Sequence, residues 1–298
     1  MKSIYSVRNI ALIILLNVIG STIAVFGRPG GPAIDEKSVL KFRLVQDFGI
    51  IVPVFINGQG PYEFLLDTGT TSTVIRPELA SALKLQAINR LMLTTVTGSQ
   101  AVPRSYLESV TLGNRSAANV EVLWQDLSAV RSLDNHISGL LGQNFLSQFN
   151  YLLSYREKRI VFEQRDELKN QMRGSAIPVE HTEGMIVVSA QSPKRSDKNI
   201  HLVLDSGSAG LMFFAGVCDR AGFEFHKSDV AQLVSTDAGM NGVTSGLLSK
   251  IIIGNRTLFD LPVVLLGTER RSQDGILPTN LFDRVYFNNS DKYVILDR

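Results

Sequence analysis

The stretch FLLDTGT, at residues 64–70, decides the fold of this 298-residue chain because it returns as LVLDSGS at residues 202–208. In both copies three apolar residues run into an aspartate, followed by Thr or Ser, then Gly, then Thr or Ser. Three further landmarks repeat in the same order at nearly the same offset. They are LGNR at 112–115 with IGNR at 253–256, GLL at 139–141 with GIL at 275–277, and KRIVFE at 158–163 with KYVILD at 292–297. This period is too long for a solenoid and predicts a duplicated domain.

Each copy has the residue pattern of strands separated by turns. In the first copy, residues 51–56 are a β-rich run, Asn57-Gly58 is a turn signal, and residues 62–66 form the next run. Residues 77–85 begin with proline and predict a short helix. Pro53 has no N–H, so we expect it at a sheet edge or at a ladder position without a donated bond. The strand pattern returns in the second copy at residues 185–190, 201–204 and 248–253. The sequence therefore predicts an all-β protein with a few short helices.

The repeat also sets the expected domain boundaries. One lobe is predicted at residues 39–163 and the other at residues 175–298. The polar stretch at residues 164–174 lies between the copies and is the natural connector.

The first residues have the pattern of a secretory signal. Lys2 and Arg8 precede an apolar run at residues 10–19, and small residues follow it. We predict a signal peptide at residues 1–27, cleaved after Ala24 or Gly27. The alternative is an uncleaved N-terminal anchor, since the extended apolar stretch is barely long enough to span a bilayer.

Residues 28–38 are then the flexible start of the mature chain. The rest of the protein is predicted to be exported, either periplasmic or secreted, or held at the membrane by the anchor.

Composition narrows the function classes. A formal net charge of +2 argues against a dedicated nucleic-acid binder, which normally carries a strongly basic face. The single cysteine, Cys218, excludes an internal disulfide. One Cys and four scattered His give no metal-ligand spacing, so we predict neither a metal nor a cofactor.

The chemistry of the repeated motif lies in Asp67 and Asp205. Each aspartate directly follows a buried strand and stands before a tight turn, in which Gly69 or Gly207 would allow the chain to reverse without a Cβ. If a pseudo-twofold axis relates the copies, the two carboxyl groups can meet at it. Two adjacent carboxylates cannot both ionise easily, so they share a proton, hold a water, deprotonate it and protonate the leaving group. The aspartic-protease dyad is the standard example of this shared proton.

At these residues the chain resembles the pepsin and retropepsin family of aspartic peptidases. The resemblance rests on Asp67-Thr68-Gly69, on Asp205-Ser206-Gly207 and on the apolar-apolar-Gly element of each lobe, and it covers roughly residues 39–298. It implies a bilobal acid-protease fold of two related β-barrel-like lobes, with a peptide or protein substrate between them. Asp67 and Asp205 would be the catalytic pair of an endopeptidase.

The resemblance also assigns supporting roles. Thr68 and Ser206 would cross-link the two active-site loops, and Thr70 and Ser208 would bond the outer carboxylate oxygens. Flap hairpins are expected at residues 93–100 and, in the second copy, at residues 236–242. Because one chain carries both aspartates, a monomer should suffice.

The chain departs from the family in one element of the second lobe. Pro278 follows Gly275-Ile276-Leu277 where the family usually has Gly, which puts the local backbone in question.

Three alternatives stay open. Asp-Thr-Gly and Asp-Ser-Gly are common turn tripeptides, although two at matching repeat positions favour a catalytic pair. The fold could also serve a non-catalytic peptide-binding protein. Finally, Ser208 lies in a near miss to the Gly-x-Ser-x-Gly elbow, and a serine hydrolase would need Asp219 and His226 as its partners.

Overall fold

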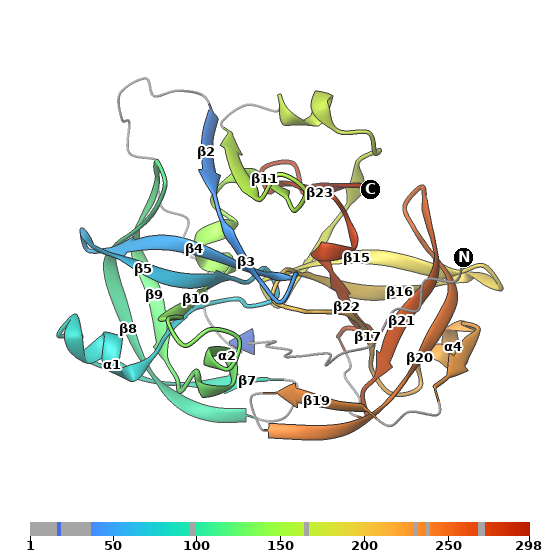
Figure 1. The fold of residues 1–298 in the computed structure, drawn as a ribbon, viewed down its shortest axis with the longest axis horizontal. Coiled ribbons are helices and arrows are strands. Elements are labelled where there is room, and N and C mark those ends of the chain that lie inside the picture. The colour runs from blue at the N-terminus through green and yellow to red at the C-terminus, as the bar shows by residue number, and fades with distance from the viewer. Residues whose placement is uncertain are drawn as a thin grey trace.

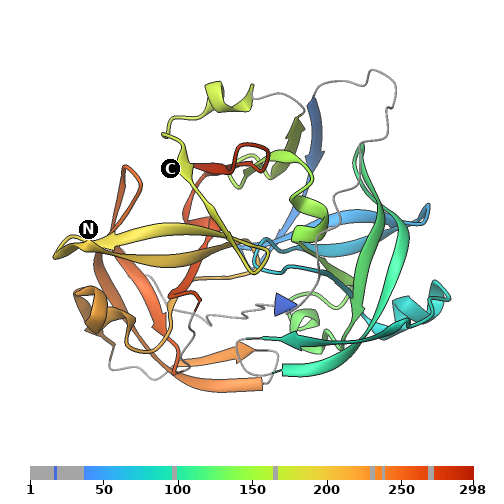
Figure 2. The same ribbon diagram turned by 180° about the vertical axis from the view of Figure 1, so that it is seen from behind.

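The computed structural model describes residues 17–18, 37–95, 99–163, 167–228, 232–236, 239–267 and 272–298. Strands account for most of these residues, so the all-β prediction is confirmed. Figure 1 shows two lobes side by side with a third group of strands above them, and Figure 2 shows the same arrangement from behind. Within the described part of the chain, no helix has the length and apolar character to cross a membrane.

The first lobe is built on a nine-stranded sheet in the order β1-β7-β8-β9-β6-β10-β5-β4-β3. Its strands are β1 (Asn17–Val18), β3 (Arg43–Val45), β4 (Gly49–Ile56), β5 (Gln59–Leu66), β6 (Thr73–Ile75), β7 (Asn89–Thr94), β8 (Ser99–Leu112), β9 (Arg115–Trp124) and β10 (Gly139–Leu141).

The second lobe has a sheet of the same size in the order β14-β15-β16-β22-β17-β21-β20-β18, with β19 paired to β20. Its strands are β14 (Glu180–Thr182), β15 (Met185–Ser192), β16 (Arg195–Asp205), β17 (Leu211–Phe213), β18 (Phe225–Lys227), β19 (Gln232–Thr236), β20 (Gly239–Ile253), β21 (Arg256–Leu265) and β22 (Gly275–Pro278). Read from β3, the first sheet runs β3-β4-β5-β10-β6-β9-β8-β7, and this order corresponds strand for strand to that of the second sheet from β14 to β18. Both lobes also have the same extra pairing, β8 with β4 and β20 with β15.

A six-stranded sheet joins the lobes in the order β13-β24-β23-β11-β12-β2. Its strands are β2 (Lys37–Lys41), β11 (Asn150–Ser154), β12 (Arg159–Glu163), β13 (Ile177–Pro178), β23 (Arg284–Asn288) and β24 (Tyr293–Asp297). Three of these strands come from each half of the chain. They meet where β11 pairs with β23, and there the rings of Tyr151 and Phe287 stack with centroids 4.7 Å apart.

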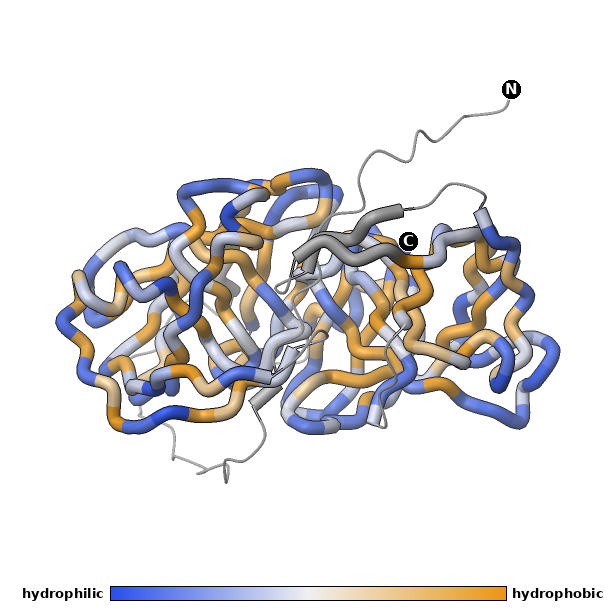
Figure 3. The backbone as a smooth tube through the Cα atoms, turned by 90° about the horizontal axis from the view of Figure 1, so that it is seen from below, coloured by the Kyte–Doolittle hydropathy of each residue, from blue (hydrophilic) through white to orange (hydrophobic). Residues whose placement is uncertain are grey.

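The helices are short, as the sequence predicts. They are α1 (Pro77–Ala82), α2 (Ser128–Arg131), α3 (Gln143–Leu146) and α4 (Val217–Ala221), with 3₁₀ turns η1 (Leu168–Gln171) and η2 (Thr279–Leu281). The largest apolar cluster includes buried side chains of both lobes and of the joining sheet. Figure 3 shows the same pattern, with hydrophobic strand segments inside each lobe and hydrophilic segments at the outer turns.

Pro53 lies in the interior of the first sheet, yet its missing N–H costs no ladder bond. On one side it faces Glu63 of β5. On its other side, β3 pairs with β4 only up to Ile51, and β8 pairs with it only from Val54 onward. Pro53 therefore occupies the gap between two partners, as expected for a ladder position without a donated bond.

Several sequence predictions fall on residues that the structure does not describe. The predicted signal peptide at 1–27 lies outside the described residues except for β1, and the predicted mature start at 28–38 does so except for its last two residues. Residues 164–166 of the connector, 96–98 of the first predicted flap and 237–238 of the second also lie outside them.

Candidate active site

Each repeated aspartate stands at the end of a central, buried strand. β5 runs parallel to β10, with Leu66 opposite Leu141, and the backbone N–H of Asp67 donates to the carbonyl of Leu141 at 3.0 Å. In the second lobe β16 runs parallel to β22, and Asp205 is in register with Pro278. The side chains of both aspartates are fully buried.

The two carboxyl groups face each other across the lobes. An added Cβ on Gly69 would lie 2.4 Å from the Asp205 carboxyl carbon, and one on Gly207 would lie 2.9 Å from that of Asp67. Each carboxyl group thus rests on the glycine of the opposite motif. Neither glycine has a positive φ. They are required because a side chain there would displace the facing carboxyl group.

Backbone N–H groups hold one oxygen of each carboxyl group. Gly69 donates to Asp67 Oδ1 at 3.0 Å, and Gly207 donates to Asp205 Oδ1 at 2.6 Å. The Oδ2 atoms of both aspartates are buried, and the two carboxyl groups lie within hydrogen-bond reach of each other. Two such acidic oxygens within one buried site favour a proton shared between the carboxyl groups.

The electrostatics point the same way. Burial raises the pKa of Asp67 well above its usual range, and the nearby Asp205 carboxyl raises it further. Burial raises the pKa of Asp205 to about 6, while the N–H of Gly207 and the side chain of Asp67 oppose that shift. Because the two groups interact closely, they titrate as a pair and retain a proton where an isolated aspartate would have lost it.

Thr68 and Ser206 cross-link the two motifs through four buried hydrogen bonds. The Thr68 hydroxyl donates to the Leu204 carbonyl at 2.8 Å and accepts from the Ser206 N–H at 2.9 Å. The Ser206 hydroxyl donates to the Leu66 carbonyl at 2.8 Å and accepts from the Thr68 N–H at 3.0 Å. The lobes are thereby held in a fixed register at the aspartates.

Thr70 and Ser208 approach the carboxyl groups through their backbone, since their N–H groups help to stabilise the ionised forms of Asp67 and Asp205. The Ser208 hydroxyl donates to the Gly210 carbonyl at 3.0 Å, so the expectation that it donates to an outer carboxylate oxygen was wrong.

The groups of a serine hydrolase are not joined by the contacts seen here. His226 Nε2 lies 3.1 Å from the hydroxyl of Ser249, and Ser208 is bonded within its own turn. Asp219 is on α4 and lines a separate cavity.

The apolar-apolar-Gly elements differ between the lobes for a steric reason. A Cβ on Gly142 would lie 2.5 Å from the Ser72 carbonyl, so the first lobe requires glycine there. Pro278 takes extended backbone angles, φ −73° and ψ 137°, and stays in register with Asp205. The proline therefore leaves the strand that supports Asp205 intact.

Three supporting residues were not predicted from the sequence. Gln143 is buried and donates from Nε2 to the Thr68 carbonyl at 2.8 Å. Tyr155, in the turn between β11 and β12, and Thr279, which directly follows β22 of the second lobe, share a hydroxyl hydrogen bond of 2.5 Å. Burial raises the pKa of Tyr155, and the charge of Asp205 raises it further. The sequence signal for Gln143 was its place directly after the Gly139–Gly142 element, whereas nothing marked Tyr155.

A cluster of possible metal ligands lies elsewhere in the first lobe. Glu63, Asp134 and His136 bring one ligand atom each within 4.8 Å of one another. The Arg43 guanidinium pairs with Glu63 at 2.9 Å and with Asp134 at 2.6 Å, so its positive charge already neutralises both carboxylates. We assign this cluster no metal.

Comparison with known proteins gives a family match for part of the first half of the chain. Residues 52–145, which include Asp67, match the model of a protein family described as "Aspartyl protease". A solved structure, the retropepsin-like aspartic protease from Rickettsia conorii, is 19% identical and has a TM-score of 0.32 over 43% of this chain and 91% of that one. No curated protein matches the chain. The family match supports the resemblance to retropepsin-like aspartic peptidases.

Proposed function

We propose that this chain is an exported aspartic endopeptidase in which Asp67 and Asp205 activate a water molecule. The observation that carries the proposal is the pair of buried carboxyl groups, each resting on the glycine of the opposite motif. The family match over residues 52–145 supports the peptidase class.

The proposed reaction uses the shared proton. One carboxylate takes a proton from the bound water, which attacks the peptide carbonyl, and the protonated partner supplies a proton to the departing amine. Raised pKa values allow one carboxyl group to stay protonated while the other is ionised. The cross-links from Thr68 and Ser206 keep the two groups at a fixed separation while the proton moves.

A polypeptide reaches this pair only if the covering segments open, because neither aspartate is exposed. The hairpins β7–β8 and β19–β20 are our candidates for the moving elements. Figure 1 shows both hairpins below the lobes, extending from opposite sides toward the midline. We further propose that one chain is sufficient for the reaction, since it contributes both aspartates.

Export is proposed on the N-terminal pattern alone, with Lys2 and Arg8 before the apolar run at residues 10–19. The test is the N-terminal sequence of chain recovered outside the cytoplasm. A start just after Ala24 or Gly27 supports a cleaved signal, recovery with membranes and an intact N-terminus supports the anchor, and an intact chain in the cytoplasm contradicts export.

One experiment distinguishes the endopeptidase from the second candidate function, a protein that binds peptides without cleaving them. Purified protein is incubated with a library of unlabelled peptides over a pH series, and the products are identified by mass spectrometry. The proposal predicts internal cleavage that Ser208→Ala retains, because that hydroxyl is bonded within its own turn. Peptides that bind and stay intact would establish the non-catalytic alternative, and cleavage lost in Ser208→Ala would favour the serine hydrolase.

A further inference from the structure

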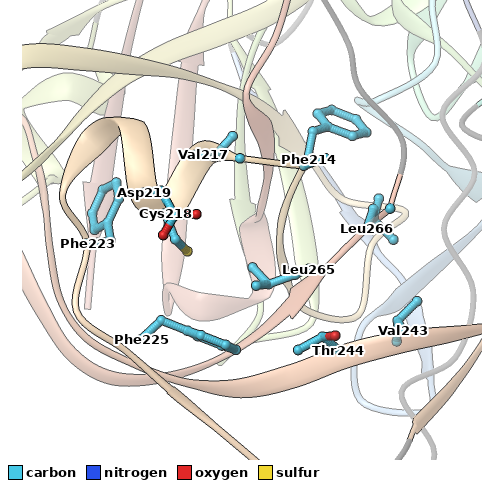
Figure 4. A pocket seen from close by; sticks show the side chains of 13 residues that line it. Phe214, Val217, Cys218, Asp219, Phe223, Phe225, Val243, Thr244, Leu265 and Leu266 are labelled. Atoms are coloured by element: carbon cyan, nitrogen blue, oxygen red, sulfur yellow. The ribbon is translucent and has the colours of Figure 1, made fainter.

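The second lobe contains a cavity of about 410 Å³ away from the aspartates. It lies between the turn into α4, α4 itself, β18, β20 and β21, and no residue of the two aspartate motifs lines it. Figure 4 shows Phe214, Phe223 and Phe225 at its walls, with Leu265 and Cys218 between them. Its size falls within the usual range for sites of small organic ligands.

The internal repeat shows why the cavity belongs to the second lobe. Phe213 pairs with Leu265 as Ile75 pairs with Trp124 in the first lobe, so Leu265 occupies the position of the larger Trp124.

Two further positions change in the same way, as their matching hydrogen bonds show. Leu266 donates its N–H to the carbonyl of Phe213 as Gln125 does to Ile75. Phe214 donates to Asp274 as Arg76 does to Ser138. At three equivalent positions the second lobe therefore replaces a Trp, a Gln and an Arg by Leu, Leu and Phe, which are smaller or apolar.

The lining has a definite chemistry. Among the described residues that line the cavity, only Asp219 carries a formal charge, and this residue is exposed. Burial raises the pKa of the Cys218 thiol to about 11, so the sulfur is neutral at physiological pH. A neutral guest has no charge to desolvate on leaving water, whereas an anion would meet Asp219 and find no cation among the described lining residues.

We propose that this cavity is a second binding site, which takes a compact, uncharged small molecule with an aromatic ring or a branched chain. The site includes Val243 and Thr244 of β20, and Val243 is the residue that pairs with Gln232 of β19. A bound molecule would thus contact the base of the β19–β20 hairpin. The inference is independent of the peptidase proposal, because it needs no catalysis.

The test uses the full chain and the neutral fluorescent probe N-phenyl-1-naphthylamine. We expect saturable binding at one site per chain, and the rise in probe fluorescence measures this binding. Cys218 is the only cysteine, so its reaction with 4,4′-dithiodipyridine reports on this cavity alone. Saturating probe should slow that reaction about tenfold, because the guest covers the thiol.

Two substitutions fill the cavity from different walls. Leu265→Trp places there the residue that the first lobe uses, and Thr244→Phe enlarges the opposite side. Each should weaken probe binding by about tenfold or more, since little space for the guest remains. Leu247→Trp is the matched control, because Leu247 is exposed on β20 and does not line the cavity.

Circular dichroism and thermal unfolding show which variants fold, and Thr244→Phe carries the test if Leu265→Trp does not. All variants keep the same apolar N-terminus, so a difference between them reports on the cavity. The inference is overturned if wild type shows no saturable binding, if a folded filling variant binds as wild type does, or if saturating probe leaves the Cys218 reaction rate unchanged.

Discussion

Replacing Thr68 with valine removes the hydroxyl group that joins the two lobes and keeps nearly the same side-chain shape. That hydroxyl donates to the Leu204 carbonyl at 2.8 Å and accepts from the Ser206 N–H at 2.9 Å, and both bonds are buried. Valine leaves two buried backbone groups without these partners, at about 1–3 kcal/mol for each. We therefore expect the free energy of unfolding to fall by about 2–6 kcal/mol.

The assay is urea unfolding followed by both far-UV circular dichroism and tryptophan fluorescence. Thr68→Ser is the control, because it keeps the hydroxyl and loses only a methyl group. Ser206→Ala should behave like Thr68→Val, since the Ser206 hydroxyl makes the two matching bonds to Leu66 and Thr68. A Thr68→Val protein within about 0.5 kcal/mol of wild type, or one no less stable than Thr68→Ser, would refute the reasoning.

Three other predictions follow from the same site. Burial raises the pKa of Asp205 to about 6 and the two carboxyl groups titrate as a pair, so the folded state binds an extra proton above pH 3.8 and loses stability as pH rises through about 6. Asp205→Asn should match wild type near pH 3.5 and be more stable by about 1–3 kcal/mol above pH 6.5, and equal unfolding free energies at pH 7 would contradict the raised pKa. Gly69→Ala should abolish peptide hydrolysis, because its Cβ would lie 2.4 Å from the Asp205 carboxyl carbon. Gly210→Ala should retain hydrolysis, since nothing lies within 4 Å of a Cβ there. Equal activity of the two variants would count against the facing geometry. Specific activity should stay constant on about hundredfold dilution, whereas a steep fall would show a site built across two chains.

The repeated motif allowed much of the fold and of the candidate site to be predicted from sequence. FLLDTGT and the three other landmarks return in the second half of the chain in the same order and at nearly the same offset. This constant offset reflects the equal strand orders of the two sheets. Strands such as β4 and β15 were visible because their apolar, β-branched residues are local signals. The turn residues after β4 were equally local, since Asn57 and Gly58 both take positive φ.

Features that depend on long-range contact could not be predicted. The pairing of β11 with β23 joins the middle of the chain to a segment near its end, as with Tyr151 and Phe287, and no local periodicity marks such a partner. The role of Gly69 depends on a carboxyl group 136 positions away, which only the folded arrangement brings to it. The Tyr155–Thr279 bond and the cavity beside α4 depend on the same long-range packing.

The most direct test of the central claim is the rate of peptide hydrolysis by Asp67→Asn and by Asp205→Asn, each purified free of wild type and shown to be folded. An amide can act neither as the base nor as the acid of the proposed pair, and the backbone donors on Gly69 and Gly207 can still bond the retained side-chain oxygen. We predict that each variant alone loses hydrolysis by at least about a thousandfold while its cross-lobe contacts and unfolding transition persist. Substantial hydrolysis by either folded variant would contradict the account.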